Sequence, residues 1–195
     1  MELIDKYLPK YNFRERHARN VLADPEVTIE AALAYRPDSD RFFRTAIAIR
    51  ELPMRMLAAL GGRRETAAPP FSFSNFTLLE SRAGRELTYG LVGRFWQFGY
   101  GLVPIADGPA FRAFEASGVA KLVLGFSATP QGSGHTKLTT ETRVFCPDRA
   151  TYRSFAPYWY LIRPVSGMIR GRTLKSIQRA SESSQTASIS QSELR

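Results

Sequence analysis

The stretch VAKLVLGFSATPQGSGHTKLTTETRVFC, residues 119–146, decides the fold because two alternating strand patterns flank a glycine-rich turn. Residues 119–130 place Leu122, Leu124, Phe126 and Ala128 on one face. Residues 131–134, Gln-Gly-Ser-Gly, are typical of a hairpin turn. Residues 135–146 alternate again, with one face formed by Leu138, Thr140, Thr142, Val144 and Cys146. The stretch therefore predicts an antiparallel hairpin with one mainly apolar face.

Upstream segments extend this hairpin into a larger sheet. Residues 11–23 predict a strand whose one face holds Phe13, Glu15, His17, Arg19 and Val21. Residues 71–80 and 86–96 predict two more strands around a turn at 81–85. Residues 97–104 read as a short strand or wide hairpin, and residues 107–114 as a loop or a short helical turn.

Helices precede and follow these strands. Asp24-Pro25-Glu26 is a strong helix start, because Asp can cap free amides and Pro suits the first helical position. That helix should end near Tyr35. We expect a second helix over residues 40–52, a further turn or two over 54–60, and a loop over 63–70.

A long C-terminal helix is predicted after Pro147-Asp148. Its apolar stripe has helical spacing and consists of Tyr152, Phe155, Trp159, Ile162, Ser166, Ile169, Thr173 and Ile177. Pro157 and Pro164 lie inside this pattern and should kink the helix or divide it into two. Residues 181–195 are polar and serine-rich, so we expect a single domain over 1–180 followed by a disordered tail.

Bulk properties bound the class of protein. The chain has 195 residues with 44% hydrophobic content, which is enough for one domain with a sizeable core. No run of 18 apolar residues or secretory signal is visible. Cys146 is the single cysteine, so no intrachain disulfide is possible. Together these features predict a cytoplasmic protein.

The net charge of +9 permits contact with anionic partners, although the excess is spread along the chain. No block of five consecutive basic residues occurs. A solvated basic surface is the simplest interpretation. A weak contact with an anionic membrane is an alternative, and specific nucleic-acid binding is not expected because no nucleic-acid-binding motif is present. The oligomeric state stays open.

The element order and three local segments resemble the START-like, or SRPBCC, superfamily. The segments are Val21–Glu26 before the first helix, Thr139–Val144 in the last strand and Tyr158–Pro164 in the final helix. The resemblance spans roughly residues 11–180. It implies an α+β helix-grip fold, in which a curved antiparallel sheet wraps around a long C-terminal helix. It also implies binding of hydrophobic small molecules between sheet and helix, with catalysis in only some members.

Candidate site residues follow from the predicted faces. Glu15 and His17 share a face with apolar neighbours, so they could orient a polar ligand atom or transfer protons, or simply form a satisfied pair. Thr140 and Thr142 could orient a ligand in an apolar lining, although threonine also favours strands in general. An aromatic set could line a pocket or fill the core, and consists of Tyr89, Phe95, Trp96, Phe126, Tyr152, Phe155 and Trp159.

Signatures of other chemistries are missing from the sequence. There is no nucleophile elbow, phosphate loop or dinucleotide fingerprint. The only histidines, His17 and His135, have no metal-ligand spacing, so we expect no metal site and no cofactor. The leading hypothesis is therefore a binder of a hydrophobic or amphipathic small molecule. A polyketide cyclase or aromatase using Glu15 and His17, and a membrane-surface lipid-transfer protein resting on Trp159 and Tyr160, are the alternatives.

Overall fold

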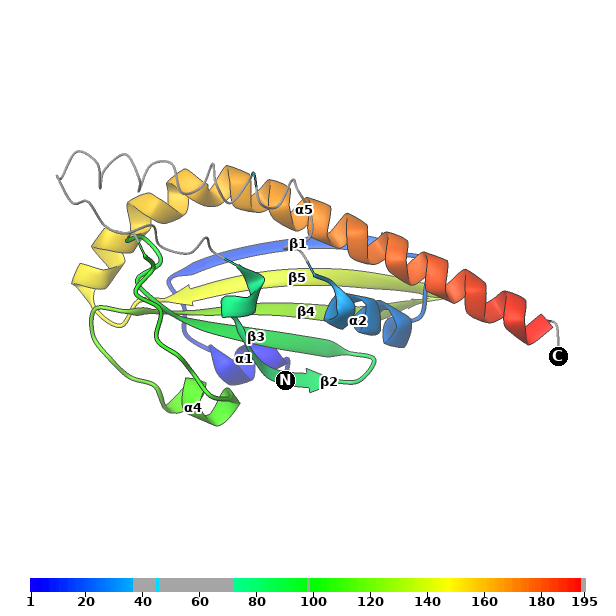
Figure 1. The fold of residues 1–195 in the computed structure, drawn as a ribbon, viewed down its shortest axis with the longest axis horizontal. Helices are drawn as coiled ribbons and strands as arrows, with labels where there is room; N and C mark the ends of the chain where they lie inside the picture. The colour runs from blue at the N-terminus through cyan, green and yellow to red at the C-terminus, as the bar shows by residue number, and fades with distance from the viewer. Residues whose placement is uncertain (37–44, 46–71, 98, 194–195) are drawn as a thin grey trace.

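The computed structural model describes residues 1–36, 45, 72–97 and 99–193. Its centre is one curved antiparallel sheet with the strand order β1-β5-β4-β3-β2 (Figure 1). The strands are β1 (Phe13–Val21), β2 (Thr77–Arg82), β3 (Glu86–Gly93), β4 (Ala120–Gly132) and β5 (His135–Phe145). Together with the long C-terminal helix, this sheet confirms the predicted α+β helix-grip class.

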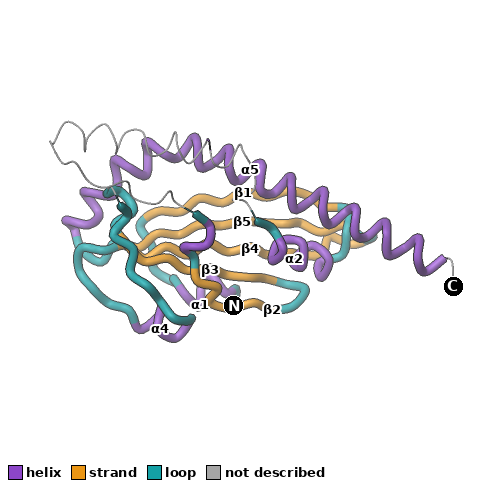
Figure 2. The backbone as a smooth tube through the Cα atoms, in the orientation of Figure 1, coloured by secondary structure: helices purple, strands orange, loops and turns teal. Residues whose placement is uncertain are grey.

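Helices cover both faces of the sheet. One face, here called the α5 face, packs against α2 (Pro25–Ala34) and α5 (Arg149–Glu193). The opposite face, here called the α1 face, packs against α1 (Leu3–Tyr7) and α4 (Gly108–Ala113). Figure 2 shows α5 running along the whole sheet above β1. The sheet therefore has two separately covered sides.

The predicted strand faces are confirmed by the hydrogen-bonded register. Glu15 pairs with Thr142 and His17 with Thr140 across β1 and β5. Leu124 pairs with Thr142 and Phe126 with Thr140 across β4 and β5. These side chains share the α5 face because cross-strand partners point to the same side of a sheet.

Several predicted boundaries were wrong. Within the segment predicted as a strand over 71–80, Phe73–Asn75 is a 3₁₀ turn and the strand begins only at Thr77. The Ser72 hydroxyl accepts a hydrogen bond from the Ser74 amide, and the Ser72 amide donates one to the Asn75 side chain. The strand predicted over 86–96 ends at Gly93, where a Cβ would lie 2.9 Å from the Tyr100 carbonyl oxygen of the returning chain. The predictions for 40–52, 54–60 and 63–70 lie outside the described residues.

α5 is one continuous helix that contains both prolines and bends in its first half (Figure 1). It extends to Glu193, so the expected disordered tail over 181–195 was wrong for the described residues. Contacts with the start of α2 explain part of this extension. The Glu182 carboxylate accepts a hydrogen bond from the Leu22 amide, and Gln185 donates one to Asp24. The Asp24 side chain is thus used in tertiary packing and makes no bond to the α2 amides.

The first turn of α5 is held by Asp148. Its carboxylate accepts hydrogen bonds from the Thr151 amide and hydroxyl, each at 2.7 Å, and from the Gly118 amide at 3.0 Å. These bonds to the ionised form lower the pKa of Asp148 to about 2. Asp148 therefore joins the helix start to the loop that precedes β4.

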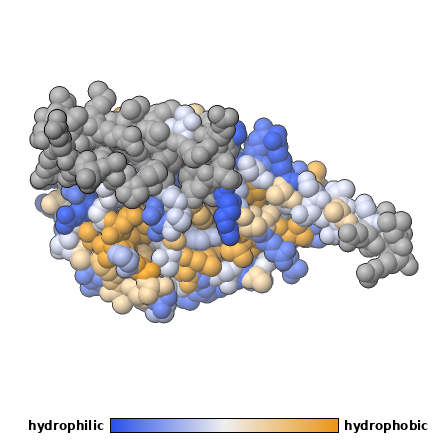
Figure 3. Space-filling view, viewed as in Figure 1, coloured by the Kyte–Doolittle hydropathy of each residue, from blue (hydrophilic) through white to orange (hydrophobic). Residues whose placement is uncertain are grey.

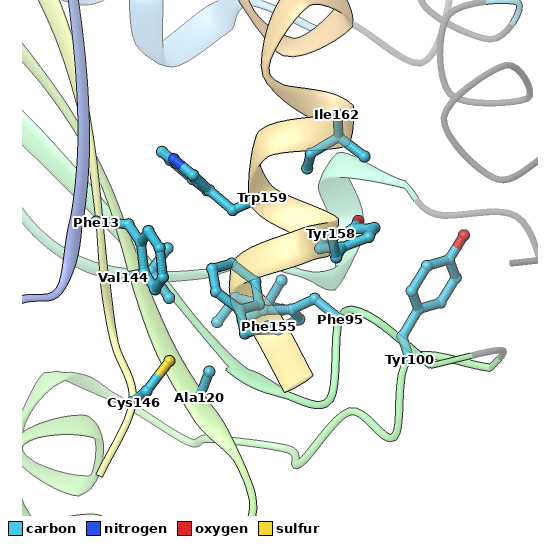
Figure 4. Close-up of a cluster of buried hydrophobic side chains, with 11 residues drawn as sticks. Phe13, Phe95, Tyr100, Ala120, Val144, Cys146, Phe155, Tyr158, Trp159 and Ile162 are labelled. Carbon is cyan, nitrogen blue, oxygen red and sulfur yellow. The ribbon is translucent and has the colours of Figure 1, made fainter. Parts of the chain in front are cut away.

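Two apolar clusters lie between the sheet and α5. The first cluster, at the N-terminal end of α5, includes Phe13, Val144, Phe155, Trp159 and Ile162 (Figure 4). The second cluster, further along α5, includes Val21, Phe126, Leu138, Leu174 and Ile177. The part of the α5 face between them is polar.

Candidate functional site

A polar row separates the two apolar clusters on the α5 face. The row consists of Glu15 and His17 on β1 and of Thr140 and Thr142 on β5. Alternation along each strand brings them to one face, as the sequence predicted. Glu15 is only 7% exposed, and both threonines are buried. The row is therefore a mostly buried polar zone within an apolar interface, and only His17 is partly exposed.

Arg170 of α5 completes this polar row. Its Nη1 donates to Glu15 Oε2 at 3.1 Å, and its Nη2 donates to Thr142 Oγ1 at 2.6 Å. The other oxygen of Glu15, Oε1, lies 2.8 Å from His17 Nε2. One carboxylate thus bridges a guanidinium from the helix and an imidazole from the sheet. Such bridging fixes the orientation of both groups.

The hydroxyl of Thr140 is different from its neighbours. It is buried and has no hydrogen-bond partner within the part of the chain that the structure describes. Buried hydroxyls are nearly always hydrogen-bonded, to protein or to ordered water. The Thr140 hydroxyl, next to His17 in the sheet, is therefore a buried polar group whose hydrogen bond the described residues do not supply.

An open groove leads to the polar row from the edge of the sheet. It has a volume of about 650 Å³ and is lined by Arg14, Glu15, Arg16, His17, Tyr160, Arg163, Pro164 and Gly167. The absence of a side chain at Gly167 keeps this groove open. A Cβ there would lie 3.5 Å from Glu15 Oε1 and 3.8 Å from His17 Cε1. The groove thus joins solvent to the Glu15–His17 pair.

The predicted aromatic set does not form one lining. Phe95, Phe155 and Trp159 are buried in the first cluster, and Trp96 packs partly buried against it. Tyr89 and Phe126 belong to the second cluster. Tyr152 is 40% exposed and stacks on Phe13, so its prediction as an interior residue was wrong. The remaining aromatics flank the polar row from both sides.

A second polar network lies on the α1 face and shares Arg14 with the lining of the groove. Glu141 accepts hydrogen bonds from Arg14 and Arg143, and Arg143 also donates to Asp5 of α1. This network attaches α1 to the sheet.

Burial raises the pKa of the Cys146 thiol to about 12, so this cysteine acts as a small apolar core residue.

Sequence reasoning missed Arg170 and Gly167. Arg170 was not identified as a site residue, although it lies four residues after Ser166 and three before Thr173. Ser166 and Thr173 are polar positions in the apolar stripe of α5. Glu15 and Thr142 are likewise polar positions in the apolar face of the sheet. Matching interruptions on two packed surfaces were the signal for a buried polar contact.

Comparisons with known proteins give limited information. No protein-family model and no curated protein matches the chain. Among solved structures, TTHA0849 from Thermus thermophilus has 10% identity and a TM-score of 0.28, and covers 90% of this chain and 99% of its own. CalU16 from Micromonospora echinospora has 10% identity and a TM-score of 0.26, with 90% and 98% covered.

Proposed function

We propose that this protein binds a hydrophobic or amphipathic small molecule between the sheet and α5, such as a lipid, a quinone or a polyketide-like compound. The polar row orients the polar end of the molecule, and the two apolar clusters flank its apolar part. The observation that carries this proposal is the polar row itself, which is reached from solvent by the groove beside Gly167.

The energetic cost of the polar row supports a binding role. Burying a carboxylate and a guanidinium costs several kcal/mol per ion, and well-packed apolar residues often stabilise a core equally well. A few convergent polar groups in an apolar setting are typical of small-molecule sites. The buried Thr140 hydroxyl adds a group whose hydrogen bond a ligand could supply.

Filling the groove should weaken binding without unfolding the protein. We expect Gly167→Leu to place a side chain over Glu15 and His17, and to weaken binding of a dansyl-labelled fatty acid at least about tenfold. The same change removes a helix-interior glycine, which should stabilise α5 by up to roughly 1 kcal/mol. Fluorescence titration and thermal unfolding of the same samples measure both effects.

Gly171→Leu is the matched control, because it lies one turn further along α5 and, apart from its own helix backbone, no atom of the described residues lies within 4 Å of its Cβ position. It should gain the same helix propensity and keep the affinity of the native chain. Equal loss of affinity in both variants would contradict the proposal, as would undiminished binding by Gly167→Leu. Native mass spectrometry of the purified protein would identify any co-purifying ligand.

A second candidate function is acid/base catalysis, as in a polyketide cyclase. The observation that favours it is the 2.8 Å contact between Glu15 Oε1 and His17 Nε2, beside an open groove. A carboxylate that orients an imidazole is a common arrangement for a general base. In this role His17 would remove a proton from a carbon between two carbonyls, and the resulting enolate would attack a further carbonyl of the same substrate chain. The π bond of that carbonyl would break, and its oxygen would take the proton back from His17.

Turnover of a poly-β-ketone model substrate would test the catalytic role. We expect His17→Gln to lower the rate by roughly 100-fold while substrate binding is retained. Unchanged cyclisation by His17→Gln, or a rate no higher than the uncatalysed one in the native protein, would leave binding as the function of the site.

A further inference from the structure

The outer side of α5 carries an exposed apolar patch. Tyr160, Leu161 and Met168 are 62%, 58% and 56% exposed. Pro157 and Pro164 are also exposed and lie on the same side at helical spacing. These five residues are called the α5 patch below. It spans about 17 Å of helix at 1.5 Å per residue.

The opposite side of α5 packs on the sheet through Phe155, Trp159 and Ile162. The apolar residues of the α5 patch therefore do not contribute to this core. Single exposed apolar residues need no explanation, but a continuous apolar patch marks a contact surface. Trp159, which the sequence suggested for such a contact, is only 6% exposed and faces the core. Tyr160, which the sequence suggested together with Trp159, is exposed, and Leu161 and Met168 lie beside it on the outer side of the helix.

The charge of this part of α5 identifies the kind of surface. Residues 149–181 contain no acidic residue and seven basic ones, namely Arg149, Arg153, Arg163, Arg170, Arg172, Lys175 and Arg179. Among them, Arg163, Lys175 and Arg179 are exposed. Figure 3 shows hydrophilic surface on the outer side of the middle of α5. An anionic partner matches this charge.

We propose that the outer side of α5 docks onto an anionic lipid surface. The exposed leucine and methionine enter the headgroup boundary, Tyr160 lies at the interface, and the exposed basic residues Arg163, Lys175 and Arg179 contact acidic headgroups. Nucleic acid fits less well, because it would leave the apolar side chains without a contact. The helix lies on the bilayer and does not cross it: within the described residues no helix is long and apolar enough to span a membrane.

The docking surface adjoins the groove that leads to the polar row. Tyr160, Arg163 and Pro164 line that groove as well as the outer side of the helix. Docking would therefore place the groove mouth at the lipid surface, where an apolar ligand dissolves. The docking itself does not depend on ligand binding, because the α5 patch lies on the outside of the helix.

Flotation with vesicles tests the proposal. The full chain should float with vesicles containing phosphatidylcholine and phosphatidylglycerol, and not with phosphatidylcholine alone. The double variant Leu161→Ser/Met168→Ser should bind at least about tenfold more weakly. Leu22→Ser/Leu33→Ser is the matched control, because both leucines are exposed but lie outside α5. It should bind like the native chain.

Charge reversal separates headgroup contact from general attraction. Lys175→Glu/Arg179→Glu should reduce vesicle binding about tenfold or more. Arg112→Glu/Lys137→Glu changes the net charge equally at exposed positions on α4 and β5, and should have a much smaller effect. No flotation of the native chain at low salt would overturn the proposal, as would equal losses in both charge pairs. Tight binding to duplex DNA that Leu161→Ser/Met168→Ser leaves unchanged would overturn it in favour of nucleic acid.

Discussion

Replacing Arg170 by methionine should destabilise the protein by about 3 kcal/mol, because a buried carboxylate then loses its cation. The Arg170 guanidinium donates to both Glu15 and Thr142, and the Glu15 side chain is only 7% exposed. Methionine retains much of the length and apolar stem of arginine, so the change removes mainly charge and hydrogen bonds. Urea unfolding at pH 7 measures the loss directly.

A double variant distinguishes loss of the ion pair from loss of packing. Glu15→Met/Arg170→Met should be more stable than the sum of the two single changes predicts, because neither charge is left buried without its partner. Lys175→Met is the control for removing an exposed cation from the same helix, and should change stability by less than about 0.5 kcal/mol. Additive single effects would contradict the assigned role of the pair.

The α5 face of the sheet could be predicted from sequence because alternation fixes which side chains share a face. Glu15, His17, Thr140 and Thr142 were expected on one face of two strands, and the register of β1 against β5 brings them into two neighbouring pairs. Sequence alone does not tell which residue of a helix lies opposite a strand. Arg170 was therefore missed, although Glu15 was identified.

The errors have physical causes in tertiary contacts that the local sequence does not contain. α1 was overlooked because five residues give too short a pattern for helical periodicity, and its position depends on tertiary contacts such as that of Arg143 with Asp5. The strand predicted to reach residue 96 was cut short by backbone packing at Gly93. The extension of α5 beyond residue 180 depends on Glu182 and Gln185, whose partners are more than 150 residues away in sequence.

Acid should destabilise the protein through Glu141, and Glu141→Gln should flatten this response. Burial opposes ionisation of Glu141, but hydrogen bonds from Arg14 and Arg143 outweigh burial and lower its pKa below the usual 4.5. A carboxyl whose pKa is lower in the folded state contributes stability that is fully present above pH 4.5. That contribution is lost as the pH falls toward the pKa of the folded protein.

Glu141→Gln should therefore cost about 3 kcal/mol at pH 7, since Arg143 remains buried with one anionic partner fewer. The stability difference from the native chain should narrow as the pH falls from 5 toward 3, because the native carboxyl becomes neutral as well. Urea midpoints measured over this pH range give both quantities. Glu30→Gln is the control, because Glu30 is exposed on α2, and its curve should stay parallel to that of the native chain. A constant difference between Glu141→Gln and the native chain at all pH values would mean that Glu141 acts through packing rather than through its charge.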